Sequence, residues 1–136
     1  MKIGNHVGSL KGKCVNKALP AKVYGMPRIE TTAECDGDLA GKPVKTLATY
    51  QAEMRSDGTF IGDCPNSGVV LAADGVATFR ANGVGKPTAE GGFSFRGPVY
   101  FETTSASLAA LNGVAHFYEW EVDAENNATW KIWACE

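Results

Sequence analysis

The sequence has few of the features that mark the common functional classes. It contains two histidines, His6 and His116, so a histidine-rich zinc site is excluded. It has no run of about 18 apolar residues, and its first residues lack the apolar centre of a signal peptide. We therefore expect no membrane span and a cytoplasmic location. The net charge of −2 gives no general attraction to polyanions, so neither nucleic acid nor a membrane is an expected partner.

Common catalytic and metal-binding motifs are also missing. The four cysteines are too widely spaced for a CxxC zinc or redox motif. We expect them to be reduced, mostly buried thiols, with two disulfides in an exported protein as the alternative. The segment 83–88 lacks the glycine spacing of a phosphate-binding loop, and no Gly-x-Ser-x-Gly nucleophile elbow is present. No metal and no cofactor are predicted.

Turn-forming residues are abundant and evenly spread. Sixteen glycines and six prolines occur in 136 residues, a length typical of one domain, so residues 1–136 are expected to form a single unit. The turn signals bracket segments rich in Val, Thr, Phe, Tyr and Trp, which predicts an all-β domain. We predict strands at 6–16, 28–38, 44–55, 58–63, 68–73, 76–86, 93–104, 113–123 and 127–135.

The strand pattern predicts an antiparallel fold. The one plausible helical element, 105–111, with Ser105 or Ser107 as a cap, is too short for a crossover between parallel strands. So many antiparallel strands close into a barrel or fold into a sandwich, and we favour a closed, calycin-like barrel of about eight to nine strands. Segment 17–27, with Tyr24 and Met26, is expected to be a long loop over the barrel mouth, and Pro98 is expected to bulge or bend its strand.

Alternation in the last three strands separates two faces. The more apolar set, which we assign to the interior, comprises Phe93, Phe95, Val99, Phe101, Val114, His116, Tyr118, Trp120, Val122, Ala128, Trp130, Ile132 and Ala134. The opposite face carries charges and large aromatic residues. If this assignment were inverted, charged residues would line a polar lumen suited to acid–base chemistry.

Segment 103–113, Thr-Thr-Ser-Ala-Ser-Leu-Ala-Ala-Leu-Asn-Gly, is followed by an alternating strand and an Asp/Asn turn. This part of the chain resembles the late segment of allene-oxide-cyclase-like barrels, a group that includes the dirigent proteins. The resemblance covers about a quarter of the chain and implies a β-barrel. It implies no particular chemistry, because the group includes cyclases, stereochemical guides and proteins of no known activity. No catalytic residue of the plant cyclases aligns with a position here.

The predicted interior contains one side chain that titrates near neutral pH. His116 could donate, accept or exchange a proton in a hollow barrel, with Tyr118 two residues along on the same face. These two residues are the candidate catalytic pair. The candidate ligand-binding wall consists of Tyr50, Met54, Phe95, Phe101, Trp120 and Trp130. The competing interpretation is a packed core in which His116 only makes hydrogen bonds.

The outer face has two interpretations. Glu119 and Glu121 could form a catalytic carboxylate pair, but we favour a charge ladder across strands with Arg96, Glu102 and Lys131. Large aromatic residues accompany these charges on the same face: Tyr100, Phe117 and Trp133. Aromatic residues on the outside of a barrel suggest a covered surface, so a homo-oligomer is expected.

Three functions remain open on the sequence. The favoured one is a barrel that binds a small apolar or aromatic molecule, and the second is a cofactor-free isomerase or cyclase that uses His116. The third is a structural or interaction role of the outer face. A cavity on the order of several hundred Å³ with His116 in its wall would support the first two functions. A filled lumen would leave the third.

Overall fold

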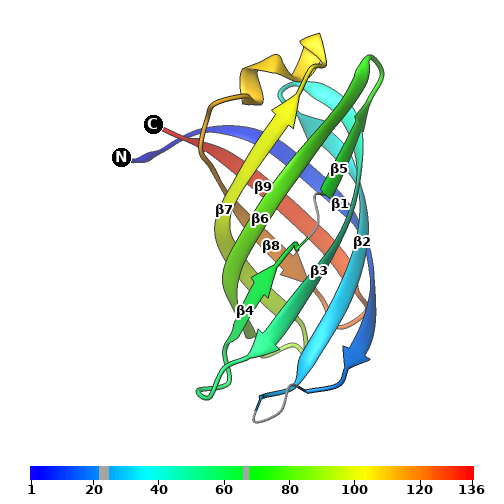
Figure 1. Ribbon diagram of the computed structural model, residues 1–136, viewed down its shortest axis with the longest axis vertical. Coiled ribbons are helices and arrows are strands. Elements are labelled where there is room, and N and C mark those ends of the chain that lie inside the picture. The colour runs from blue at the N-terminus through cyan, green and yellow to red at the C-terminus, as the bar shows by residue number, and fades with distance from the viewer. Residues whose placement is uncertain (22–24, 66–67) are drawn as a thin grey trace.

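The computed structural model describes residues 1–21, 25–65 and 68–136. It confirms the all-β prediction, with nine strands and one short 3-10 helix (Figure 1). The elements are β1 (Ile3–Leu19), β2 (Arg28–Leu39), β3 (Lys42–Met54), β4 (Phe60–Asp63), β5 (Gly68–Ala72), β6 (Gly75–Pro87), β7 (Phe93–Thr103), η1 (Ala106–Leu111), β8 (His116–Val122) and β9 (Asn127–Cys135).

The strands form a closed antiparallel barrel. Neighbours in the chain are neighbours in the sheet, and β9 pairs with β1 to complete the circle. β4 and β5 both pair with β3 on one side and with β6 on the other. These two short strands therefore share one position in the barrel wall, which has eight positions although there are nine strands.

The wall is interrupted between β4 and β5. Gln51 of β3 pairs with Asp63 at the end of β4, and Leu47 of β3 pairs with Val69 near the start of β5. From Gln51 to Leu47, β3 spans four residue steps, whereas its partners from Asp63 to Val69 are six steps apart in the chain. The register with β3 therefore shifts by two residues between β4 and β5.

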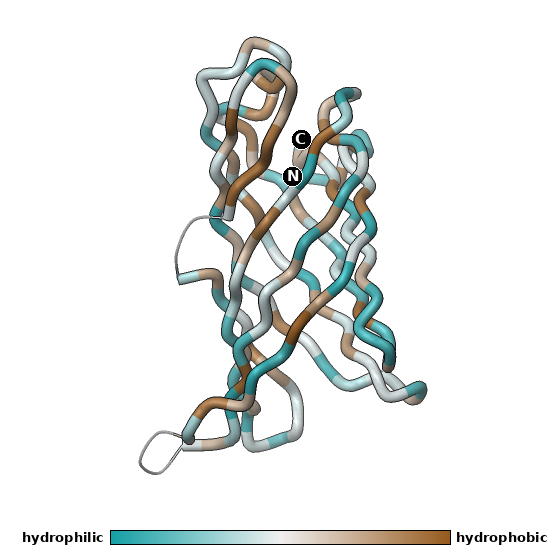
Figure 2. The backbone as a smooth tube through the Cα atoms, turned by 90° about the vertical axis from the view of Figure 1, so that its right-hand side faces the viewer, coloured by the Kyte–Doolittle hydropathy of each residue, from teal (hydrophilic) through white to brown (hydrophobic). Residues whose placement is uncertain are grey.

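The predicted interior face is confirmed. In β9, buried positions alternate with partly or fully exposed ones from Asn127 to Trp133. In β8 the predicted inward residues His116, Trp120 and Val122 are buried and Tyr118 is partly exposed. Figure 2 shows hydrophobic and hydrophilic residues interspersed along the strands. Among the described residues, the buried polar side chains are Thr31, Thr46, Ser105 and His116, and none of these is a carboxylate, a lysine or an arginine. The inverted assignment, with charged residues in the lumen, is therefore wrong.

β7 does not carry a bulge at Pro98, the first of the two predicted alternatives. Its register with β8 is unbroken from Phe93 to Val99, and its register with β6 is the same on both sides of Gly97 and Pro98, although these two residues have no paired partner in β6. Instead, the neighbouring Gly97 lets β6 approach closely, because a Cβ there would lie 2.1 Å from the carbonyl oxygen of Asn82. Gly12 has the same role between β1 and β2, where a Cβ would lie 1.8 Å from the carbonyl oxygen of Glu34. Glycine thus permits the tight coiling that closes the barrel.

The two ends of the barrel differ. At the end where β7 finishes, η1 covers the opening and buries Leu108 and Leu111 (yellow to orange in Figure 1). At the other end the loop is shorter than predicted, because β1 runs to Leu19 and β2 starts at Arg28. Tyr24 lies outside the described residues. The predicted long loop over the mouth, 17–27, is therefore partly strand.

The described cysteines are unpaired thiols. Cys14 and Cys35 are buried, which agrees with the reduced interpretation, and burial raises their pKa values to about 12 and about 11. In the described part of the chain no helix is long and apolar enough to span a membrane.

Candidate functional site

A cavity of about 70 Å³ lies inside the barrel beside the β4–β5 interruption. By volume it has room for several water molecules, and it is about half the size of the ~150 Å³ apolar cavity that holds benzene. This is far smaller than the several hundred Å³ that a hollow barrel would give, so most of the lumen is filled by side chains. The lining residues are Ala33, Cys35, Thr46, Ala48, Tyr50, Gly62, Asp63, Cys64, Phe79, Ala81, Asn82, Phe95, Tyr118, Trp120 and Trp130.

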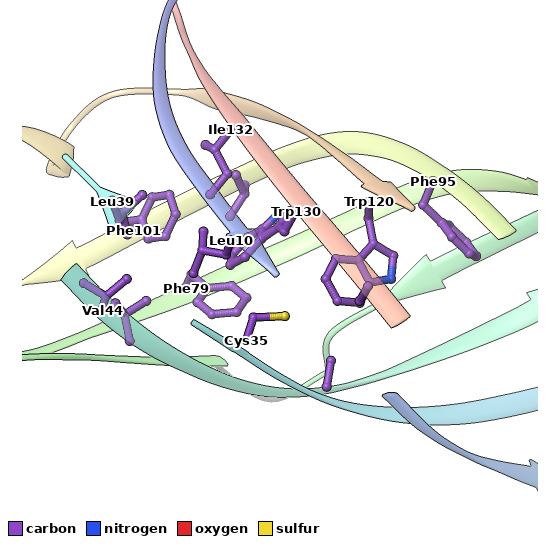
Figure 3. Close-up of a cluster of buried hydrophobic side chains, with 14 of the residues drawn as sticks. Leu10, Cys35, Leu39, Val44, Phe79, Phe95, Phe101, Trp120, Trp130 and Ile132 are labelled. Atoms are coloured by element: carbon purple, nitrogen blue, oxygen red, sulfur yellow. The ribbon is translucent and has the colours of Figure 1, made fainter. Parts of the chain in front are cut away.

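The cavity is lined by both large and small side chains. Strands β7, β8 and β9 contribute large aromatic residues: Phe95, Tyr118, Trp120 and Trp130. Strands β2, β3, β4 and β6 contribute the large residues Tyr50 and Phe79 as well as six small ones, which we call the small-residue wall: Ala33, Cys35, Thr46, Ala48, Gly62 and Ala81. Figure 3 shows indoles and Cys35 entering this region from separate strands. Large and small residues pack against one another, as Phe95 does against Gly62, and the cavity is the space that this packing leaves unfilled.

Ring contacts and one hydrogen bond fix the aromatic wall. The indole Nε1 of Trp120 donates to the hydroxyl of Tyr50 at 3.1 Å, and the two rings are nearly perpendicular with centroids 6.2 Å apart. Trp120 and Trp130 also meet edge to face, at 6.4 Å and 85°. Aromatic rings prefer this arrangement because the positive edge of one meets the negative face of the other. The wall is therefore preorganised.

The polar groups of the cavity are uncharged near neutral pH. Burial raises the pKa of the Tyr50 and Tyr118 hydroxyls above their ordinary value, and it raises that of the Cys64 thiol to about 11. The Tyr118 hydroxyl donates to the carbonyl oxygen of Asn82 at 3.0 Å. Among the described lining residues Asp63 is the one acidic residue, and it is exposed. The buried residues of this described lining therefore include no charged side chain.

The structure brings together five of the eight candidate residues. Tyr50, Phe95, Tyr118, Trp120 and Trp130 all line the cavity. The other three lie elsewhere: Met54, Phe101 and His116. Met54 packs against the core at the end of β3, where it pairs with Phe60.

His116 lies in the packed end of the barrel. It is 1% exposed, and its ring meets the Phe101 ring edge to face at 5.3 Å. Its Nδ1 atom is buried and has no hydrogen-bond partner among the described residues. Burial lowers the pKa of the imidazole, while the Val114 backbone has a smaller, opposite effect. The candidate proton-transfer group is thus a neutral core side chain outside the cavity.

Sequence reasoning missed the small-residue wall. Ala33, Ala48 and Ala81 occupy inward positions of strands that were predicted correctly, yet alanine and glycine carry no signal for a binding site. Sequence reasoning also missed that β4 and β5 share one position in the barrel wall. This arrangement depends on pairings between segments that are distant in the sequence.

Part of the predicted charge ladder is present on the outer face: Arg96 lies beside both Glu119 and Glu121, whereas Glu102 is not part of it. Arg96 Nη1 lies 3.7 Å from Glu119 Oε1, and Arg96 Nη2 lies 3.9 Å from Glu121 Oε1. The Ser94 hydroxyl donates to Glu121 Oε1 at 2.8 Å. Lys131 faces Glu119 in the register, whereas Glu102 faces Thr78. Exposed ion pairs of this kind stabilise little, and they lie on the outside of the barrel.

The described residues offer no cluster of three or more His, Cys, Asp or Glu side chains that could hold a metal ion.

Comparison with known proteins identifies the fold and nothing further. No protein-family model matches the chain, and no curated protein matches it. A protein with unknown function from Clostridium acetobutylicum is similar in structure, with a TM-score of 0.81, 15% identity and 100% of both chains covered. A conserved protein of unknown function from Rhodopseudomonas palustris gives a TM-score of 0.79 at 10% identity, covering 98% of each chain.

A third similar structure is a β-barrel-like protein from Acinetobacter baumannii, with a TM-score of 0.79 and 12% identity. It covers 99% of this chain and 96% of its own. The β-barrel part of the predicted resemblance is therefore supported. None of these three structures is described as an allene oxide cyclase.

Proposed function

We propose that this protein binds one small molecule with an aromatic or apolar body, without transforming it, in the cavity beside the β4–β5 interruption. The observation that carries the proposal is a mostly apolar cavity in the barrel whose aromatic lining residues Tyr50, Trp120 and Trp130 are held by edge-to-face contacts. Small-molecule sites are concave, mostly apolar and largely preformed, with a few polar groups in the lining.

The size of the cavity limits the affinity. A ligand with about eight non-hydrogen atoms gains at most about 1.5 kcal/mol per atom, and usually far less. We therefore expect a Kd between about 1 mM and 1 μM, which corresponds to about 4 to 8 kcal/mol.

The alternative, a cofactor-free isomerase or cyclase, has weaker support. A proton-transfer group must come within hydrogen-bond reach of its substrate. His116 does not line the cavity, and the Tyr118 hydroxyl, which does, already donates to Asn82 and has a raised pKa. No contact in the described residues favours a reaction over simple binding.

Filling the cavity tests the proposal. Ala81→Leu places a larger side chain on the small-residue wall, so we expect it to weaken binding of benzyl alcohol at least about tenfold, by steric exclusion. Ala110→Leu, in the exposed part of η1, is the matched control and should bind as the wild type does. Isothermal titration calorimetry measures both affinities, and circular dichroism checks that both variants are folded.

Unchanged affinity in a folded Ala81→Leu variant would place the ligand elsewhere and contradict the proposal. Ala48→Val, a smaller change on the same wall, serves as a second test if Ala81→Leu does not fold.

A further inference from the structure

We propose that the ligand carries a hydrogen-bond acceptor, such as an alcohol, ether or ketone oxygen, and that the indole N–H of Trp130 binds this atom. The inference rests on the proposed function and adds one polar contact to its apolar ligand. Trp130 is then the residue that positions the ligand's polar group. A single buried donor that the protein leaves unpaired carries the argument.

Trp130 is a buried side chain whose N–H group has no partner. The residue is 5% exposed and occupies a buried position of β9. Its ring meets the rings of Phe79 and Trp120, at centroid distances of 5.0 and 6.4 Å, but its Nε1 atom makes no hydrogen bond to any described residue. Buried indole N–H groups usually find a partner, because an unpaired one has lost its hydrogen bond to water without replacing it.

The unpaired N–H is accessible from the cavity. Trp130 is one of the lining residues. Among the described residues, the unpaired side-chain polar atom that is completely enclosed is His116 Nδ1, so Trp130 Nε1 keeps some accessible surface. Almost all of the Trp130 side chain is covered inside the barrel, and the open space beside it there is the cavity. A ligand in the cavity can therefore reach this donor.

The other N–H and O–H groups of the buried lining already donate within the protein. Trp120 Nε1 donates to the Tyr50 hydroxyl at 3.1 Å, and the Tyr118 hydroxyl donates to the carbonyl oxygen of Asn82 at 3.0 Å. The Thr46 hydroxyl donates to a carbonyl oxygen of β2 at 3.5 Å. The cysteine thiols of the lining are weak donors.

The Tyr50 hydroxyl is the competing donor, because its contact with Trp120 uses only its oxygen. It also makes a side-chain hydrogen bond with Thr31. The Thr31 hydroxyl donates to Asn16 Oδ1 at 2.7 Å, and an amide oxygen can only accept, so the Thr31 proton is already used. In its bond with Thr31, the neutral Tyr50 hydroxyl is therefore the donor, which leaves Trp130 as the N–H group that a ligand can use.

Benzyl alcohol and ethylbenzene test the inference, because they differ only by a hydroxyl in place of a methyl group. Proton–nitrogen correlation NMR of the full chain gives one indole signal for each tryptophan: Trp120, Trp130 and Trp133. We expect benzyl alcohol to move the Trp130 proton signal downfield, as formation of a hydrogen bond does, and ethylbenzene to cause no such shift. Trp120, whose N–H is already paired, and Trp133, which packs against His6, are the internal controls.

Trp130→Phe gives a second readout, in affinity. The substitution removes the N–H and part of the ring, so its effect on ethylbenzene binding measures the change in packing alone. We expect the ratio of benzyl alcohol affinity to ethylbenzene affinity to fall about fivefold, the effect of one ordinary hydrogen bond. Isothermal titration calorimetry measures both affinities in the wild type and in the variant.

The failures can be told apart. If both probes bind and shift the Trp130 signal alike, or if Trp130→Phe leaves the affinity ratio unchanged, the role of Trp130 is wrong while binding in the cavity stands. A downfield shift of the Trp120 signal in place of the Trp130 signal would also overturn it. If neither probe binds, the proposed function fails and this inference fails with it. If Trp130→Phe does not fold, the NMR comparison in the wild type decides.

Discussion

At the scale of single residues, His116 shows that strand alternation predicts whether a side chain is buried but not which groups surround it. Strand alternation placed this side chain correctly in the interior. What alternation could not give is its surroundings, because Phe101 and the closed end of the barrel come together only through strand pairing. The result is a buried imidazole whose Nδ1 has no partner in the described part of the chain.

The buried imidazole of His116 should make the free energy of unfolding depend on pH. Its pKa in the folded protein lies below the ordinary 6.5, so below that pH the unfolded chain binds the proton more readily. Stability is therefore complete above 6.5 and falls as pH drops through 6.5 toward the folded-state pKa. His116→Leu removes the titrating group while keeping a similar volume, so we expect it to abolish this part of the pH dependence and to preserve or raise stability at neutral pH.

Calorimetric unfolding at about pH 7.5 and about pH 5 measures the effect. Carboxyl groups whose pKa is lowered in the folded protein, such as that of Asp74, change the stability only below pH 3.8. Between about pH 5 and about pH 7.5 the pH dependence of stability therefore comes from histidine. A His116→Leu variant with the same loss of stability between the two pH values as the wild type would contradict the account.

At the scale of elements, Asp74 fastens η1 to the β5–β6 turn. Its Oδ1 accepts hydrogen bonds from the hydroxyls of Ser105 and Ser107, both at 2.6 Å, and its Oδ2 accepts from the backbone N–H of Ser107 at 3.0 Å. Ser105 or Ser107 was expected to cap η1. Ser105 does occupy the N-cap position, but its hydroxyl makes no capping hydrogen bond and donates to Asp74 instead. A carboxylate from a neighbouring turn thus holds the element that closes one end of the barrel.

Asp74→Asn should loosen that closure. The hydrogen bonds to Ser105 and Ser107 hold the pKa of the Asp74 carboxyl well below its ordinary 3.8, so its stabilisation is present above 3.8 and is lost as pH falls further. An amide cannot accept on both sides, so we expect faster amide hydrogen exchange in residues 105–111 at neutral pH. Asp57→Asn, whose carboxyl accepts only from Thr59 in its own turn, is the control. Equal protection of residues 105–111 in the wild type and both variants would remove Asp74 from this role.

The elements themselves were largely predictable from local sequence. All nine strands were predicted near their observed bounds, since turn residues and alternation are local signals. Two local predictions differ from the structure because strand pairing outweighs the local preference. β1 continues to Leu19 through a segment that was expected to be a loop, and the register of β7 with β8 is unbroken at Pro98, where a bulge or bend was expected. The sharing of one barrel position by β4 and β5 follows from their pairings with β3 and β6, which no local pattern encodes.

At the scale of the whole molecule, the barrel is asymmetric. One barrel position is split between β4 and β5, and η1 lies at one end. The cavity lies beside the split position, and most of the lumen is filled by side chains. Homo-oligomer formation stays a prediction: Tyr100 is 54% exposed on the outer face, whereas the His6 ring packs against Trp133. Analytical ultracentrifugation would measure it.

The most direct measurement of the central claim is a crystal structure of the protein soaked with 4-bromobenzyl alcohol, whose bromine gives an anomalous signal. If the ligand binds in the cavity, we expect one strong anomalous peak inside the barrel, between the indole of Trp120 and the methyl group of Ala81. Crystals of Ala81→Leu should show no such peak. An empty cavity at saturating concentration, or a peak confined to the outer surface, would contradict it.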